Sequence, residues 1–330
     1  MKYTQPSTNL GAPCLDSETW ARKLPTLLTL LLLTLTACHR APQLPLIAII
    51  VPSQDNPYFK AEAEAAAARA LQLGYRVRID AHNDDAYRQD NLIDAAIASN
   101  AAALILDNAG TDASISTVRR ATQAGIAVFL IDREISAHGI AKAQIISDND
   151  QGARLAAQAF AQALNNHGDY AELIGRESDA NAQIRTHGFH AILDASPQLK
   201  LVAAQSANWS QSEAFQKTET MLQAHPSISG IIAGNDTMAL GAAAAVKGAN
   251  RPDIRITGFD GSNDAINAIN SGELTATVLQ PAAFISQLAV DQADLYLHTH
   301  TTGKPELQII PCDLVDKSNA AHYKDFAKLP

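Results

Sequence analysis

The feature of this sequence that most constrains its fold is a regular alternation of short apolar runs with alanine-rich helical patterns from Leu46 onward. The first run, LIAIIV at 46–51, is apolar at every position, which is typical of a strand in a parallel sheet covered on both faces. The next segment begins at Pro57 and reaches Gly74, residues that suit the start and the end of a helix. Strands that alternate with helices predict parallel sheets with right-handed crossovers.

The same alternation continues almost to the end of the chain. Further strands are predicted at 76–80, 102–107, 126–132, 143–147, 170–175, 199–205, 228–234, 254–259, 274–279 and 307–311. Further helices are predicted at 89–98, 113–123, 151–164, 182–193, 212–222, 237–246, 264–269 and 285–297. The roughly 290 residues involved are enough for two α/β domains.

The residues that precede this pattern predict an export signal. Arg22 and Lys23 are followed by the uncharged run LPTLLTLLLLTLTA at 24–37. Its length suits the hydrophobic core of a signal peptide and is short for a transmembrane helix. We therefore expect the protein to be exported to the periplasm or cell envelope.

The end of that run, LTAC at 35–38, resembles a bacterial lipobox, in which small residues precede a cysteine that receives the lipid. This predicts a lipoprotein signal peptide over 1–37, lipidation at Cys38 and a tether over 38–45. The lipid would be the protein's attachment to the membrane. An ordinary signal peptide with an incidental cysteine is the alternative.

Charge and cysteine content exclude several classes of function. Removing residues 1–37 takes three basic and two acidic side chains from the 25 and 34 of the chain, which leaves 22 and 32 and a net charge of −10. Such a chain has no electrostatic reason to bind nucleic acid or an anionic membrane surface. With Cys38 lipidated, Cys312 is the only thiol left, so no disulfide is expected. The pair His298 and His300 suits a solvated helix end better than a metal site, and we predict no cofactor.

Polar and aromatic side chains follow five of the predicted strands. They are Asn56 with Tyr58 and Phe59, Asp132 with Arg133, Asn235 with Asp236, Asp260, and Gln280. Ligands of open α/β sheets bind beyond the carboxyl ends of the strands. Carboxylate, guanidinium and carboxamide groups pair with adjacent sugar hydroxyls, and aromatic rings cover the apolar faces of a sugar. Each residue alone could be a helix cap or a turn former, but together they favour a sugar site.

Seven short motifs occur in order along the chain: SQDNPYF (53–59), LIDRE (130–134), ISDND (146–150), RTHGF (185–189), GNDTMALGA (234–242), GFDG (258–261) and TVLQP (277–281). In this order and spacing the chain resembles the type I periplasmic binding proteins of sugar ABC transporters, and most closely the D-ribose-binding proteins. The resemblance extends from Leu46 to about Lys317.

This resemblance implies an α/β fold of two doubly wound parallel-sheet lobes joined by a hinge that the chain crosses three times. The crossings are expected near 147–148, 280–281 and 312–313. The N-terminal lobe would comprise 46–147 plus 281–312, and the C-terminal lobe 148–280 plus 313–330.

The resemblance also implies the ligand-binding residues, which are Asn56, Tyr58, Phe59, Asp132, Arg133, Arg185, Trp209, Asn235, Asp260 and Gln280. Tyr58 and Trp209 stand where ribose binders typically have phenylalanine, and Asp55 stands where asparagine is common. Ribose is therefore one candidate among pentoses, furanoses and polyols. Asp148 and Asp236 are assigned to capping or hinge roles.

The function implied is that of a monomeric receptor, without enzymatic activity, that captures a monosaccharide by hinge closure and delivers it to an ABC permease and its ATPase. A receptor that presents its sugar to a chemoreceptor or histidine kinase is the alternative. A repressor related to the lac repressor shares this architecture but needs a DNA-binding domain and a basic face, which an exported acidic chain does not offer.

Overall fold

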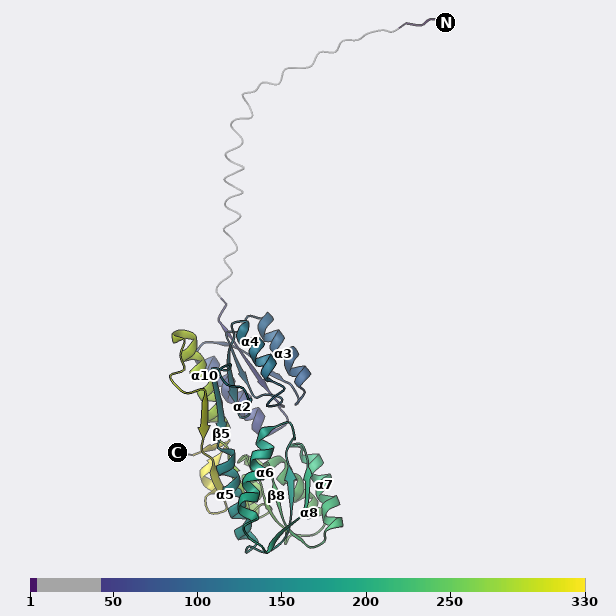
Figure 1. Cartoon of the computed structure of the whole chain (residues 1–330), viewed down its shortest axis with the longest axis vertical. Coiled ribbons are helices and arrows are strands. Elements are labelled where there is room, and N and C mark those ends of the chain that lie inside the picture. The colour runs from purple at the N-terminus through teal and green to yellow at the C-terminus, as the bar shows by residue number, and fades with distance from the viewer. Residues whose placement is uncertain (5–42, 330) are drawn as a thin grey trace. The chain divides into compact units, whose positions relative to one another are not determined.

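The computed structural model describes residues 1–4 and 43–329 of the chain. Cys38 and most of the predicted signal peptide and tether lie outside these residues. None of the helices within the described part is long and apolar enough to cross a membrane. Residues 44–329 contain two α/β lobes, each built on one six-stranded sheet (Figure 1).

The first lobe has the strand order β11-β5-β4-β3-β1-β2, with every neighbouring pair parallel. Its strands are β1 (Leu46–Val51), β2 (Arg76–Ala81), β3 (Ala103–Leu106), β4 (Ala127–Ile131), β5 (Ala143–Ser147) and β11 (Leu307–Ile310). Its helices are α2 (Pro57–Gln72) and α10 (Ala282–Thr299), which pack together over one face, and α3 (Ala86–Ala98) and α4 (Ile115–Gln123) over the other (Figure 1). The central strands β1, β3 and β4 are buried at every position, as their apolar sequences predict.

The second lobe has the equivalent order β12-β10-β9-β8-β6-β7. Its strands are β6 (Gly168–Ile174), β7 (Leu199–Ser206), β8 (Ile228–Ala233), β9 (Arg255–Thr257), β10 (Ala276–Leu279) and β12 (Asp313–Asp316). Its helices are α5 (Asn149–Ala163) and α6 (Ala180–Leu193) on one face, and α7 (Gln211–Ala224), α8 (Asp236–Gly248) and α9 (Asn263–Ser271) on the other. The strand β12 was not expected from the sequence, and it pairs antiparallel with β10. The predicted fold of two parallel-sheet lobes is confirmed, and β12 adds one antiparallel strand at this edge, which the chain enters directly from β11 without a crossover helix.

The chain passes between the two sheets three times. It does so from β5 into α5, from β10 into α10, and from β11 into β12. Asp148 caps the first of these junctions, since its carboxylate accepts a hydrogen bond from the backbone N–H of Gln151 at 3.0 Å. The exact lobe boundaries stay predictions.

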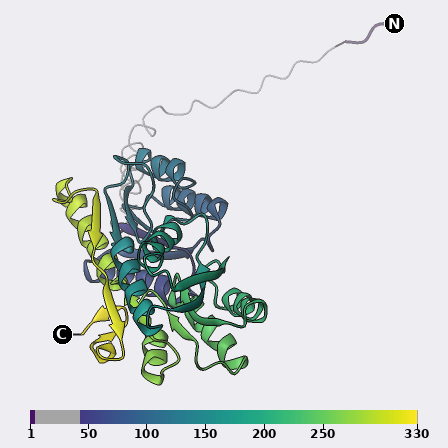
Figure 2. The same cartoon turned by 60° about the horizontal axis from the view of Figure 1, so that its bottom comes forward.

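The C-terminal segment contacts both lobes. A short hairpin of β13 (Tyr323–Lys324) and β14 (Ala327–Lys328) follows the 3₁₀ helix η1 (Ala320–His322), near the end marked C in Figure 2. Asp325 accepts a hydrogen bond from the Asn263 side chain of α9 at 2.5 Å. The ring of Phe326 packs edge-on against Tyr58 of α2, with centroids 5.6 Å apart. The end of the chain therefore buries an aromatic ring against the first lobe while it is hydrogen-bonded to the second.

Candidate functional site

An enclosed pocket lies between the two lobes, at the carboxyl ends of both sheets. In this closed arrangement the side chains leave a cavity of only about 10 Å³. The residues that line it are Tyr58, Phe59, Asp132, Arg133, Asp179, Asn181, Arg185, Trp209, Asn235, Asp260 and Gln280. The structure thus brings together every residue of the predicted ligand-binding set except Asn56.

Arg133 is the central cation on the first-lobe side, and its side chain is only 2% exposed. Its Nη1 donates to Asp84 Oδ1 at 2.8 Å and to the carbonyl of Asn108 at 3.0 Å. Its Nε lies 2.8 Å from Asp179 Oδ2 and 3.4 Å from Asp107 Oδ1. Burial disfavours the charged guanidinium, but the surrounding carboxylates outweigh burial and raise the pKa of Arg133 well above its usual value. Arg133 therefore remains a cation inside the pocket.

The Nη2 atom of this guanidinium is available to a ligand. Among the residues that the structure describes, Arg133 Nη2 is buried and has no hydrogen-bonding partner. Gln280 Oε1, on the opposite side of the pocket, is likewise buried without a hydrogen-bonding partner among the described residues. An unpaired buried donor or acceptor costs about 1–3 kcal/mol. A bound molecule with hydroxyl groups satisfies both, because a hydroxyl can donate and accept.

Tyr58 and Asp132 form a second polar pair on the first lobe. The Tyr58 hydroxyl donates to Asp132 Oδ1 at 3.2 Å. Burial, opposed mainly by the charge of Arg133, raises the pKa of Asp132. Asp132 has a positive φ of 57°, a conformation that an aspartate tolerates better than most residues. This backbone turn follows β4 directly and directs the carboxylate to the pocket.

Two acids lie behind this wall of the pocket. Glu62 and Asp107 are both fully buried, and burial raises the pKa of each well above its usual range. The nearby Asp107 carboxyl raises the pKa of Glu62 further, whereas the charge of Arg133 lowers the pKa of Asp107. Among the described residues, no group donates a hydrogen bond to either carboxyl.

Arg185 is the central cation on the second-lobe side. Its Nη1 donates to the carbonyl of Gly234 at 2.8 Å and lies 3.4 Å from Asp260 Oδ1. Its guanidinium stacks on the Phe259 ring at 4.0 Å from the centroid. Asp260 also accepts from Gln280 Nε2 at 2.8 Å. Burial raises the pKa of Asp260 well above its usual value, and the charge of Arg185 counteracts this.

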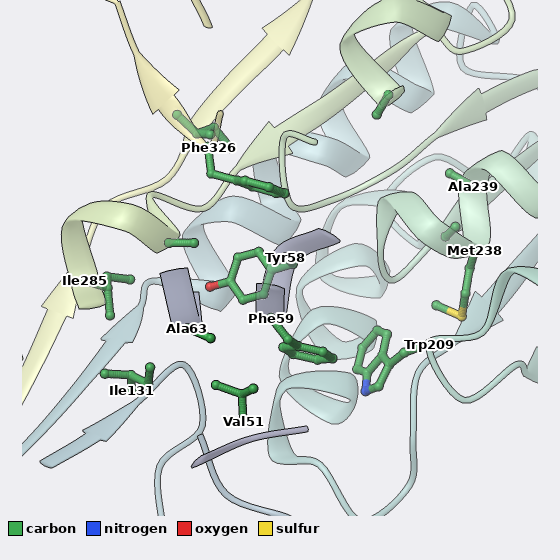
Figure 3. Close-up of a cluster of buried hydrophobic side chains, with 14 of the residues drawn as sticks. Val51, Tyr58, Phe59, Ala63, Ile131, Trp209, Met238, Ala239, Ile285 and Phe326 are labelled. Atoms are coloured by element: carbon green, nitrogen blue, oxygen red, sulfur yellow. The ribbon is translucent and has the colours of Figure 1, made fainter. Parts of the chain in front are cut away.

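The aromatic walls come from both lobes. Phe59 of α2 and Trp209, which follows β7, lie next to each other at the pocket (Figure 3). The Phe59 ring also lies under the Arg133 guanidinium, 5.0 Å from centroid to Cζ. Trp209 has a positive φ of 64°, and its Nε1 donates to Asp179 Oδ2 at 3.1 Å. Together these rings offer flat apolar faces beside the polar groups.

Two asparagines of the predicted set act as helix caps. Asn56 Oδ1 accepts from the N–H of Tyr58 at 3.0 Å at the start of α2, and Asn56 lies on an outer groove instead of the enclosed pocket. Asn235 Oδ1 accepts from the N–H of Met238 at 2.9 Å, yet Asn235 also lines the pocket. Capping and pocket lining are therefore compatible at Asn235, because capping occupies only one end of its carboxamide.

Asp236 does not cap α8, which corrects the role expected for it. Asn235 occupies the cap position, and the buried Asp236 carboxylate accepts from the N–H of Ser262 at 2.7 Å and from the Thr277 hydroxyl at 2.5 Å. Asp236 instead ties the start of α8 to the loop after β9 and to β10.

Sequence reasoning missed Asp179 and Asn181 in the pocket, and Asp84 and Asp107 beside Arg133. Asp84 and Asp107 follow β2 and β3, and Asp179 follows the loop after β6. Inspection of these further strand ends would have found them. Among the residues that the structure describes, no group of three or more potential ligands gathers for a metal ion.

Comparison with known proteins identifies the family. A family model described as a periplasmic binding protein domain matches residues 47–301. A D-apiose import binding protein of Paraburkholderia graminis is 56% identical over 299 residues, which cover 91% of this chain and 95% of that protein. A second D-apiose import binding protein, from Actinobacillus succinogenes, is 51% identical over 283 residues, 86% of this chain and 91% of that protein.

Ribose binders are more distant than the sequence motifs suggested. A ribose import binding protein of Haemophilus influenzae is 33% identical, over 89% of this chain and 98% of that protein. Among solved structures, an ABC transporter solute-binding protein of Actinobacillus succinogenes with bound D-allose has a TM-score of 0.80 at 28% identity, and covers 84% of this chain and all of that one. The chain belongs to the periplasmic binding protein family, as a non-enzymatic receptor of the sugar ABC transporters with a periplasmic or envelope location.

Proposed function

We propose that this protein captures D-apiose, or a closely related furanose, and delivers it to an ABC importer. The observation that carries the proposal is the convergence of charged, carboxamide and aromatic side chains from both lobes on one enclosed pocket. The choice of sugar is supported by two relatives named for D-apiose import, at 56% and 51% identity over most of the chain.

The chemistry of the pocket suits a small sugar with several hydroxyls. Asp132, Asp260 and Arg133 offer hydrogen-bonding partners for adjacent hydroxyl groups, and the Arg133 cation forms stronger hydrogen bonds than a neutral partner does. Apiose is a branched pentose that cyclises only as a furanose, so it presents a compact ring with a tertiary hydroxyl and a hydroxymethyl group. The wider indole of Trp209 and the hydroxyl of Tyr58, in place of phenyl rings, are consistent with a ligand that differs from ribose in shape.

Capture requires both lobes. Asp132 and Arg133 extend from the first lobe, whereas Arg185 and Asp260 extend from the second. A sugar that contacts both sets binds the closed state more tightly than the open state, and so shifts the equilibrium toward closure. The closed shape is then the form that the transporter recognises.

A thermal-shift panel tests the choice of ligand. D-apiose, D-ribose, D-allose and myo-inositol are compared at equal concentrations on the same protein. A sugar present at a hundredfold excess over its Kd stabilises the native state by about 2.7 kcal/mol, which is a shift of several degrees. We expect D-apiose to give the largest shift. A larger shift with D-ribose would contradict the proposed specificity, and no shift with any sugar would contradict the proposed function.

We further propose that the mature protein is anchored by lipid at Cys38. Expression of the native chain with labelled palmitate should yield a labelled, membrane-associated protein, and Cys38→Ser should yield an unlabelled one. Cys312→Ser is the matched control and should retain the label, because Cys312 is buried and lies far along the chain from the lipobox. Unlabelled native protein in the soluble periplasmic fraction would contradict the anchor.

A further inference from the structure

The start of helix α6 carries two pocket residues that reach across to the other lobe. Asp179 is the N-cap of α6, and Asn181 lies in its first turn. Both side chains are almost fully buried. Both contact residues that immediately follow β4 in the first lobe, although α6 belongs to the second lobe.

The Asp179 carboxylate already has partners at both of its oxygens. Oδ1 accepts from the backbone N–H of Asn181 at 2.9 Å. Oδ2 accepts from Trp209 Nε1 at 3.1 Å and lies 2.8 Å from Arg133 Nε. Because these contacts occupy the carboxylate, Asp179 acts on a ligand through Trp209 and Arg133.

Asn181 continues this connection through a chain of hydrogen bonds. Its Nδ2 donates to the Asp132 carbonyl at 3.3 Å and to Asp132 Oδ2 at 3.4 Å. Its Oδ1 accepts from Asn149 Nδ2 at 3.0 Å, and Asn149 Oδ1 accepts from Arg185 Nε at 2.7 Å. These hydrogen bonds link Arg185, the main cation of the second lobe, to Asp132, an acid of the first lobe. They lie beside the β5–α5 junction.

We propose that Asp179 is a positioning residue that couples Trp209 to Arg133 when the lobes close around a sugar. It fixes the indole ring within the second lobe through one hydrogen bond, and it receives the guanidinium of the first lobe on closure. A phenyl ring has no N–H to offer Asp179, which explains why tryptophan suits position 209 in a chain with aspartate at 179. The inference deepens the proposed sugar-binding function and rests on it.

Two substitutions at Asp179 separate this role from helix capping. Asp179→Asn keeps a capping oxygen but presents an N–H group to Trp209 and Arg133. Asp179→Ser also keeps the cap and removes both other contacts. Each is expected to weaken sugar binding on the order of tenfold, through a faster dissociation rate, without a large change in the melting temperature of the sugar-free protein. Asp194→Asn, at the exposed opposite end of α6, is the matched control and should bind as the native protein does.

A double-mutant cycle with Trp209→Phe tests the coupling itself. Affinities for whichever sugar of the panel binds most tightly are measured by titration calorimetry for the native protein, Asp179→Ser, Trp209→Phe and the pair. If Asp179 acts through Trp209, the double variant should lose several-fold less affinity than the product of the single losses. Losses that simply multiply, or native affinity in both Asp179 variants, would overturn the inference and leave the proposed function intact. Failure of the native protein to bind any of the sugars would overturn the proposed function, and this inference with it.

Discussion

Replacement of Arg133 by alanine is expected to weaken sugar binding by about a hundredfold or more. The guanidinium is the counter-charge for Asp84, Asp107 and Asp179, and its Nη2 is free for a ligand within the described part of the chain. Its loss removes the cationic donor from the ligand and leaves the buried Asp179 carboxylate of the second lobe without its cation when the lobes close, at a cost of about 2–5 kcal/mol, and each 1.4 kcal/mol corresponds to a factor of ten in affinity.

Two further variants make this expectation specific. Arg133→Lys keeps the charge but loses the planar fork that contacts several groups at once, so we expect an intermediate loss. Arg120→Ala removes a half-exposed guanidinium on α4 that pairs with Asp90 and Asp94, and it should leave affinity unchanged. Titration calorimetry with the sugar identified by thermal shift provides the measurement. If Arg133→Ala binds the sugar with an affinity within about threefold of the native value, Arg133 is not part of the site. A threefold change is smaller than the tenfold change that corresponds to about 1.4 kcal/mol.

The central strands of the first sheet, β1, β3 and β4, could be predicted from the sequence because each carries a continuous apolar run. LIAIIV at 46–51 and AVFLI within 126–132 are buried at every position of β1 and β4. The strand β12 escaped prediction because its sequence, DLVD, is short and carries an acid at each end. Backbone pairing with β10 stabilises β12 as a strand, although its sequence alone does not predict one.

The pocket was predicted through one rule, that ligands bind beyond the strand ends, together with the family motifs. The rule predicts Asp132, Arg133 and Asp260 at a common site, and all three line the pocket. It could not predict the contacts of Asp179 with Trp209 and Arg133. These contacts depend on how the two lobes meet, and no pattern in the sequence indicates them. The sequence also could not distinguish Asn56, which caps α2 outside the enclosed pocket, from Asn235, which caps α8 inside it.

Substitution of Gly175 by alanine is expected to displace Trp209 and to damage both stability and binding. Gly175 directly follows β6, and a Cβ atom there would lie 2.0 Å from Trp209 Cη2 and Cζ2. The indole cannot move freely, because its N–H donates a hydrogen bond to Asp179 Oδ2 at 3.1 Å. Overpacking of this kind typically costs 1–3 kcal/mol, and we expect about that loss of stability together with a loss of affinity of tenfold or more.

Trp209 itself reports the displacement. In protein expressed without residues 1–37, Trp209 is the only tryptophan, so its emission should shift to longer wavelength in Gly175→Ala as the ring becomes more exposed. Gly248→Ala is the matched control, since a Cβ at Gly248 in α8 meets nothing within 4 Å, and alanine there should be neutral or slightly stabilising. Adding Trp209→Phe to Gly175→Ala should restore part of the lost stability, because the shorter ring frees the space that the methyl group needs. Native emission and native affinity in Gly175→Ala would mean that the indole does not occupy the position against β6 on which the aromatic wall of the pocket depends.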